Sequence, residues 1–158
     1  MIYTNHFQLS NHSKMGIYLC EVIKMRGYES LKEQMLNLKN WAVIGVTSKK
    51  DRYGYKIWKT LKEHGYNAYG VSPNYDEIEG EKIYHSIEDI TETIDVVDMV
   101  VAPRISIDVL DEIKNKGVEF VFFQPGSYNE EVLKKADELG LSYIVEDCIY
   151  ATLKAMEN

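Results

Sequence analysis

The sequence predicts an α/β protein of a single domain, in which helices cover both faces of a doubly wound parallel sheet. Three observations support this prediction. Short apolar runs alternate with amphipathic stretches of helical length after residue 40, and glycines stand where the helices should stop. The 158 residues suffice for one domain with a buried core. Strands and helices in regular succession imply right-handed crossovers and therefore parallel strands.

The N-terminal part of the chain differs from the rest. Up to Gly27 the residues show neither strand nor helix periodicity, so we expect a flexible extension over residues 1–28, followed by a domain over residues 29–158. Within that domain, Ser30 is an N-cap candidate for a helix over residues 30–38. The first 24 residues are expected to be dispensable, and Met25 is an alternative natural start.

The sheet and its helices are predicted from local signals in chain order. Uninterrupted apolar runs predict strands at 41–46, 68–71, 96–101, 120–123 and 142–145, with a short edge strand around 82–84. Helical length and spacing predict helices at 55–63, 105–115 and 129–139, which end at Gly65, Gly117 and Gly140, and a last helix at 149–156.

The segment from Gly45 to Gly54 joins the first expected strand to the next helix and suits a phosphate group. Unpaired N–H groups at a helix N-terminus attract anions, and a glycine permits close approach of the ligand. Although the chain carries a formal net charge of −7, six basic residues gather here: Lys49, Lys50, Arg52, Lys56, Lys59 and Lys62. The expected ligand is a nucleotide or another phosphate-bearing cofactor. Two plainer interpretations stay open, a tight turn for the glycines and a solvated helix face for the last three lysines.

Composition excludes several other classes of function. The acidic balance argues against nucleic-acid partners, which require basic surface. No apolar run approaches the ~20 residues of a membrane span, and the N-terminus lacks the layout of a secretory signal, so no membrane partner and a cytoplasmic location are expected. Cys20 and Cys148 have neither CxxC nor Cys/His spacing, which indicates no disulfide framework and no metal site.

A nicotinamide dinucleotide site is poorly matched. Such a site requires a G-x-G-x-x-G turn and an acidic residue at the end of the second strand, where it holds the ribose hydroxyls. Here the next glycine after Gly45 is Gly54, and the second expected strand ends in Val71-Ser72-Pro73-Asn74. A position without a carboxylate tolerates an additional ribose phosphate, as in coenzyme A (CoA) or NADP.

Five segments together resemble a known family. They are WAVIGVTSKKDRYGYKI at 41–57, GYNAYGVSPNYDEIEGEKIYHSIEDI at 65–90, IDVVDMVVAP at 94–103, FFQPGSYNEE at 122–131 and EDCI at 146–149. From about Leu31 to Ile149 the chain resembles the small single-domain CoA-binding proteins, which are similar to the nucleotide-binding domain of the succinyl-CoA synthetase alpha subunit. It departs from the family pattern at Thr47, where Ala-Ser is common after the valine, and at Lys50, where proline is usual. The resemblance implies a Rossmann-like fold and CoA or acyl-CoA as the ligand.

The resemblance also implies which residues contact the ligand. The pyrophosphate would lie against the loop and the following helix, the ribose and its 3′-phosphate after the second strand, and the adenosine after the strand at 96–101. The pantetheine arm would lie after the strand at 120–123. In that order, the residues implied are Gly45, Thr47, Ser48, Arg52, Tyr53 and Gly54; Pro73 and Asn74; Val101, Ala102, Pro103 and Arg104; and Gln124, Pro125 and Gly126. Turn chemistry alone also accounts for 72–74 and 124–126.

No catalytic residue is predicted, because no G-x-S-x-G, HExxH or P-loop motif occurs. Cys148 follows the last expected strand, where it could meet a pantetheine thiol, although a buried structural thiol is favoured. The expected function is that of a CoA-binding carrier, sensor or regulatory module that is more plausibly not an enzyme. The alternative is an NADP-dependent oxidoreductase or another nucleotide-binding enzyme. A homodimer or an unidentified protein partner stays open.

Overall fold

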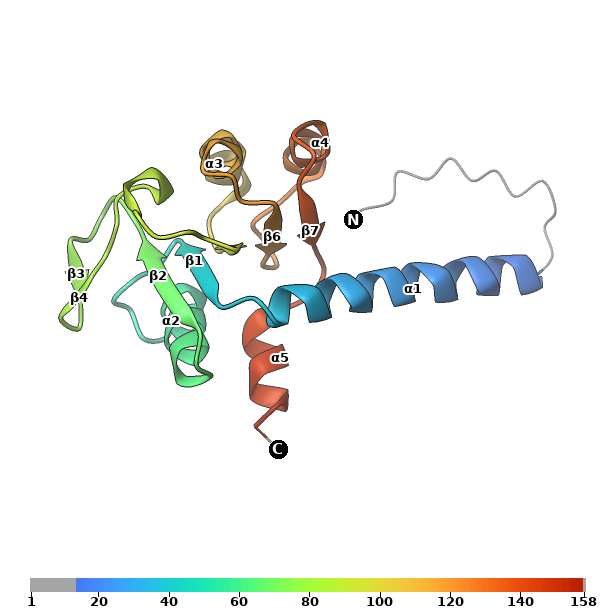
Figure 1. Cartoon of the computed structure of the whole chain (residues 1–158), viewed down its shortest axis with the longest axis horizontal. Helices are drawn as coiled ribbons and strands as arrows, with labels where there is room; N and C mark the ends of the chain where they lie inside the picture. Colours follow the sequence, from blue (N-terminus) through green and yellow to red (C-terminus); the bar gives the residue numbers. More distant parts are fainter. Residues whose placement is uncertain (1–13, 158) are drawn as a thin grey trace.

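Five parallel strands form the central sheet of the computed structural model, which describes residues 14–157 (Figure 1). Their spatial order is β2-β1-β5-β6-β7. The strands pair in parallel throughout, as predicted. Their bounds are β1 Asn40–Ile44, β2 Asn67–Val71, β5 Val96–Met99, β6 Phe120–Phe123 and β7 Ser142–Ile144.

Helices cover both faces of this sheet and enclose two apolar layers (Figure 1). On one face, Leu110 and Val132 bring α3 and α4 into the core, and on the other Met35, Trp58 and Leu153 bring in α1, α2 and α5. The doubly wound α/β prediction is therefore confirmed. The helices are α1 Lys14–Leu36, α2 Tyr53–Glu63, α3 Pro103–Asn115, α4 Glu130–Glu138 and α5 Ile149–Ala155, with a short 3-10 helix, η1, at Ile87–Asp89.

The chain reverses its direction of travel across the sheet at β1. From β1 it crosses to β2 on one side and then returns to β5 on the other, so Ile44 lies between Val71 and Met99. Such a reversal is a topological switch point, and open α/β sheets bind ligands outside the carboxyl ends of the strands there. In this fold that place lies between the ends of β1 and β5.

The N-terminal helix is much longer than predicted. The expectation of no regular structure up to Gly27 is wrong from Lys14 onward, because α1 begins there rather than at Ser30. Leu31 and Met35 are buried, whereas the N-terminal part projects past the sheet (Figure 1) and leaves Met15 76% exposed. Residues 1–13 lie outside the described part of the chain. None of the helices between residues 14 and 157 is long and apolar enough to cross a bilayer.

Smaller differences occur at strand ends. β1 and β5 stop before the expected limits of Val46 and Val101, because the N–H groups of Gly45 and Val46 both turn to the carbonyl oxygen of Val71. Helix α3 starts at Pro103 rather than at 105, since proline suits the first helical position. The expected edge strand at 82–84 contributes a single bridge from Tyr84 to β2, beside an antiparallel pair, β3 Glu77–Ile78 and β4 Glu81–Lys82.

Candidate functional site

The predicted ligand-binding residues gather at the carboxyl ends of the strands, because parallel strands all end on the same side of the sheet. The loop with Gly45, Thr47 and Ser48 follows β1 and leads to Arg52, Tyr53 and Gly54 at the start of α2. The other predicted residues follow their strands directly: Pro73 and Asn74 after β2, Val101, Ala102, Pro103 and Arg104 between β5 and the first turn of α3, and Gln124, Pro125 and Gly126 after β6.

Gly45, directly after β1, lies close to the residues that follow β5. Its φ of +106° is in the region that favours glycine, and a Cβ built there would lie 2.8 Å from both the Val100 carbonyl oxygen and Val101 Cγ1. The backbone at the switch point therefore leaves no room for a side chain at position 45. This supports the plainer interpretation, in which the turn itself requires a glycine there.

Gly54, in the first turn of α2, also has no room for a side chain. It is buried, and a Cβ on it would lie 2.2 Å from the Gly45 carbonyl oxygen. The first turn of α2 thus rests on the end of β1 with no room for a side chain between them. Substitution of Gly45 by valine would disturb this contact as well as any ligand contact, so it cannot separate binding from folding.

The N-terminus of α2 has no side-chain cap. Arg52 is the N-cap residue and makes no capping bond, while the first turn contains no acidic residue. The first N–H groups of a helix have no partner within the helix, and the helix dipole places partial positive charge there. Arg52 and Tyr53 are exposed beside these groups. The arrangement can accept an anion such as a phosphate.

The six basic residues of this region divide into two groups. Lys59 and Lys62 form ion pairs with Glu79 and Glu81 of the hairpin β3–β4, and Lys50 lies 3.8 Å from Glu79. No ion pair joins Lys49, Arg52 or Lys56 to any residue that the structure describes, and the Lys56 ammonium lies 5.3 Å from the centre of the Tyr53 ring. Unpaired positive charge therefore lies on the loop before α2, at Lys49 and Arg52, and in the first turn of the helix, at Lys56.

Tyr75 is a site residue that the sequence reasoning missed. Its hydroxyl lies 3.0 Å from Thr47 Oγ1 and accepts from Ser48 Oγ at 3.4 Å. The hydrogen bonds with Ser48 and Thr47 lower the pKa of this phenol. Tyr75 thus connects the turn after β2 to the loop after β1. Its position two residues after Pro73 was the available signal.

Gln124 is occupied by contacts within the protein. Its Nε2 donates to Asp98 Oδ1, and its Oε1 accepts from the Ile149 N–H at 3.3 Å. Both Gln124 and Asp98 are buried. Complete burial raises the pKa of Asp98 well above its ordinary value, an effect that the Gln124 hydrogen bond only partly opposes. The Gln124 side chain therefore links β5 and β6 to α5.

Asp147 anchors α1 to the end of β7. Its Oδ2 accepts from Lys32 Nζ at 2.6 Å and from the Tyr28 hydroxyl, while its Oδ1 accepts from the Cys148 N–H. Burial works to raise the pKa of Asp147, but Lys32 and Tyr28 outweigh it and hold the pKa below its ordinary value.

Cys148 is the half-buried N-cap of α5. No group of three or more His, Cys, Asp or Glu residues within the described chain could hold a metal ion.

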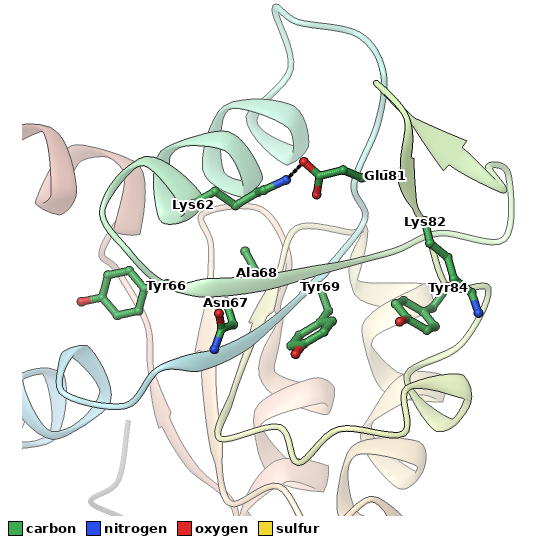
Figure 2. Close-up of a pocket in the computed structure, with 8 residues that line it drawn as sticks. All are labelled: Lys62, Tyr66, Asn67, Ala68, Tyr69, Glu81, Lys82 and Tyr84. Atoms are coloured by element: carbon green, nitrogen blue, oxygen red, sulfur yellow. Dashed lines mark ion pairs between the residues drawn. The ribbon is translucent and has the colours of Figure 1, made fainter.

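A cavity of about 440 Å³ lies elsewhere, along the outer edge of β2 (Figure 2). None of the predicted ligand-binding residues lines it. Figure 2 shows Lys62 of α2 reaching toward Glu81, and the Lys62 ammonium also lies 4.4 Å from the centre of the Trp58 ring. The Trp58 indole N–H donates to the Ala68 carbonyl oxygen at 3.1 Å. The lining residues are Lys62, Tyr66, Asn67, Ala68, Tyr69, Glu81, Lys82 and Tyr84.

One known protein family matches most of this chain. The family model of the CoA binding domain matches residues 39–154, from the start of β1 into α5. The chain belongs to the CoA-binding domain family. The family expected from the sequence is thereby confirmed.

Members of the CoA-binding domain family similar to this chain occur alone and within larger enzymes. The uncharacterized protein YneT of Bacillus subtilis is 29% identical over 119 residues, which cover 75% of this chain and 88% of YneT. An acetate–CoA ligase (ADP-forming) of Methanocaldococcus jannaschii is 33% identical over 109 residues, which cover 66% of this chain but 16% of the ligase. The chain therefore spans only a small part of that ligase.

A solved structure has the same CoA-binding domain fold. A hypothetical protein from Pyrococcus horikoshii OT3 superposes with a TM-score of 0.76 at 35% identity, covering 82% of this chain and 92% of that one. This match includes most of the small protein from Pyrococcus.

Proposed function

We propose that this chain binds coenzyme A or an acyl-CoA at the carboxyl edge of its sheet, with the pyrophosphate between the β1 loop and the N-terminus of α2. The observation that carries the proposal is the open N-terminus of α2 beside the β1–β5 switch point, flanked by the unpaired charges of Lys49 and Arg52. Membership of the CoA-binding domain family supports CoA over other phosphate-bearing ligands.

Within this proposal the protein acts as a carrier, sensor or regulatory module in the cytoplasm, without evident catalysis of its own. The ligase relatives contain this domain as a small part of a longer chain, which supports a binding role for the domain. Both cysteines are free, which suits a reducing compartment. A homodimer or another protein partner is also proposed. The exposed apolar side chains of α1, among them Met15 and Leu19, support it.

The proposal is tested by titration calorimetry of the full chain with CoA, acetyl-CoA, NADP and NAD. Binding of CoA or acyl-CoA at least tenfold tighter than either nicotinamide cofactor is the expected result. A preference for NADP would instead support the alternative of an NADP-dependent oxidoreductase. No binding of CoA at any concentration up to the millimolar range would refute the proposal.

The location of the site is tested by reversing one exposed charge. Arg52→Glu places a carboxylate at the N-cap of α2 and should weaken CoA binding about tenfold or more, because it repels the pyrophosphate. Arg26→Glu makes the same change of charge on the exposed surface of α1 and is the matched control. Equal effects of the two substitutions would place the ligand elsewhere.

A further inference from the structure

We propose that Tyr75 is a positioning residue of the CoA site, which holds Thr47 so that the Thr47 hydroxyl donates to an oxygen of the CoA pyrophosphate. This inference rests on the proposed function. It adds a residue from the turn after β2 to a phosphate site that is otherwise built from the β1 loop and α2. It also gives Thr47, where this chain departs from the Ala-Ser common in the family pattern, a definite role.

Thr47, Ser48 and Tyr75 each carry one hydroxyl hydrogen, so the cluster has three to donate. The Ser48 hydroxyl donates to the Tyr75 hydroxyl. A second hydroxyl hydrogen forms the bond between Thr47 Oγ1 and the Tyr75 hydroxyl oxygen, which lie 3.0 Å apart. The Lys49 N–H donates to Thr47 Oγ1 at 3.3 Å, so Thr47 already serves as an acceptor. The third hydrogen has no acceptor among the residues that the structure describes.

The remaining hydrogen belongs to Thr47 when Tyr75 donates. Tyr75 receives a hydrogen bond from the Ser48 hydroxyl. A phenol that accepts in this way still has its own hydrogen to give, and Thr47 Oγ1 is in reach. The Thr47 hydroxyl is then a donor fixed in place without a protein acceptor. A hydrogen bond from such a donor to a charged oxygen is stronger than one between neutral groups.

The position of Thr47 favours phosphate as the acceptor. Thr47 lies between Gly45 and the open N-terminus of α2, in a loop with the unpaired cations Lys49 and Arg52. No carboxylate is paired with the three hydroxyls in the contacts of residues 14–157. The pyrophosphate is the part of CoA that the loop is proposed to hold, whereas the 3′-phosphate would lie after β2.

The test measures the affinity of the full chain for CoA and for 3′-dephospho-CoA. Thr47→Val should weaken both ligands about tenfold or more, and Tyr75→Phe should weaken both by about threefold to tenfold. Thr47→Ser, which keeps a hydroxyl, should restore most of the affinity. The double variant should bind about as well as Thr47→Val alone, because Tyr75 acts through Thr47. Tyr84→Phe is the matched control, since the nearby Tyr84 ring contacts Tyr69 and Lys82 rather than the loop.

Several results would overturn the inference. Unchanged affinity in Tyr75→Phe would do so while leaving the proposed function intact, and so would losses that add in the double variant. A loss confined to CoA would assign Tyr75 to the 3′-phosphate instead. Failure of the unchanged chain to bind CoA would refute the proposed function and this inference together. If a variant does not fold, NMR of labelled tyrosine in the unchanged chain decides: the Tyr75 signal must shift with both ligands.

Discussion

Gly54 packs so closely against the Gly45 carbonyl that the fold alone requires a glycine at position 54. In most helices a glycine replaced by alanine gains about 1 kcal/mol of stability. Gly54 should behave in the opposite way, because its added methyl group would lie 2.2 Å from the Gly45 carbonyl oxygen. We expect Gly54→Ala to lower the free energy of unfolding by about 1–3 kcal/mol. Urea denaturation measures this, and a stabilised variant would contradict the contact.

Asp98 gives a prediction about pH. Its pKa is raised in the folded state, so the folded protein holds this proton more tightly than the unfolded chain does. The free energy of unfolding should therefore fall as pH rises from the ordinary aspartate pKa toward the raised one. Asp98→Asn cannot ionise, so it should become more stable relative to the unchanged chain as pH rises. Urea denaturation of both proteins at pH 5 and pH 8 checks the sign, and a constant difference would show that Asp98 is already ionised.

The site could be predicted from sequence only in part. Residues such as Gly45 and Pro73 follow strands, so their place at one sheet edge depends on topology alone. The contact of Tyr75 with Thr47 depends instead on the conformation of the turn after β2, which no local pattern specifies. Likewise the hydrogen bond from Gln124 to Asp98, which lies 26 positions earlier in the chain, follows from no local pattern.

Among the elements, α1 departs most from expectation. The helix signal in a sequence is a one-sided apolar stripe, and α1 has such a stripe only where Leu31 and Met35 pack against the sheet. Toward its N-terminus apolar residues face several directions, which hides the periodicity. The five strands were found because each is a compact apolar run. The two-residue strands β3 and β4 were missed because they are too short for any pattern.

The structure sharpens the prediction that residues 1–24 are dispensable. Tyr28 and Lys32, which bind Asp147, both follow Met25, and Met25 itself is 65% exposed. A chain that starts at Met25 should melt within a few degrees of the full chain, as measured by circular dichroism. Lys32→Met in the full chain is the comparison. It should cause the larger loss, because it leaves a partly buried carboxylate without its cation. A large loss on truncation would show that the earlier residues stabilise the domain.

For the molecule as a whole, the distribution of charge matters more than its sum. The net charge of −7 repels anions from most of the surface. The acidic hairpin residues Glu79 and Glu81 pair with Lys59 and Lys62, which removes these cations from the phosphate site but leaves Lys49 and Arg52 available. The protein can thus attract an anionic cofactor to one place while remaining acidic overall.

The contact between Trp58 and Ala68 has a consequence for the behaviour of the protein at high concentration. An open sheet exposes two edges to which a strand from another molecule can add, and such additions start aggregation. At the β2 edge the Ala68 carbonyl is taken by Trp58, and the Gly70 carbonyl is taken by Tyr84. At the opposite edge, β7 is only three residues long. Neither edge of this sheet therefore offers a long run of unpaired backbone groups to which a strand of another molecule could add.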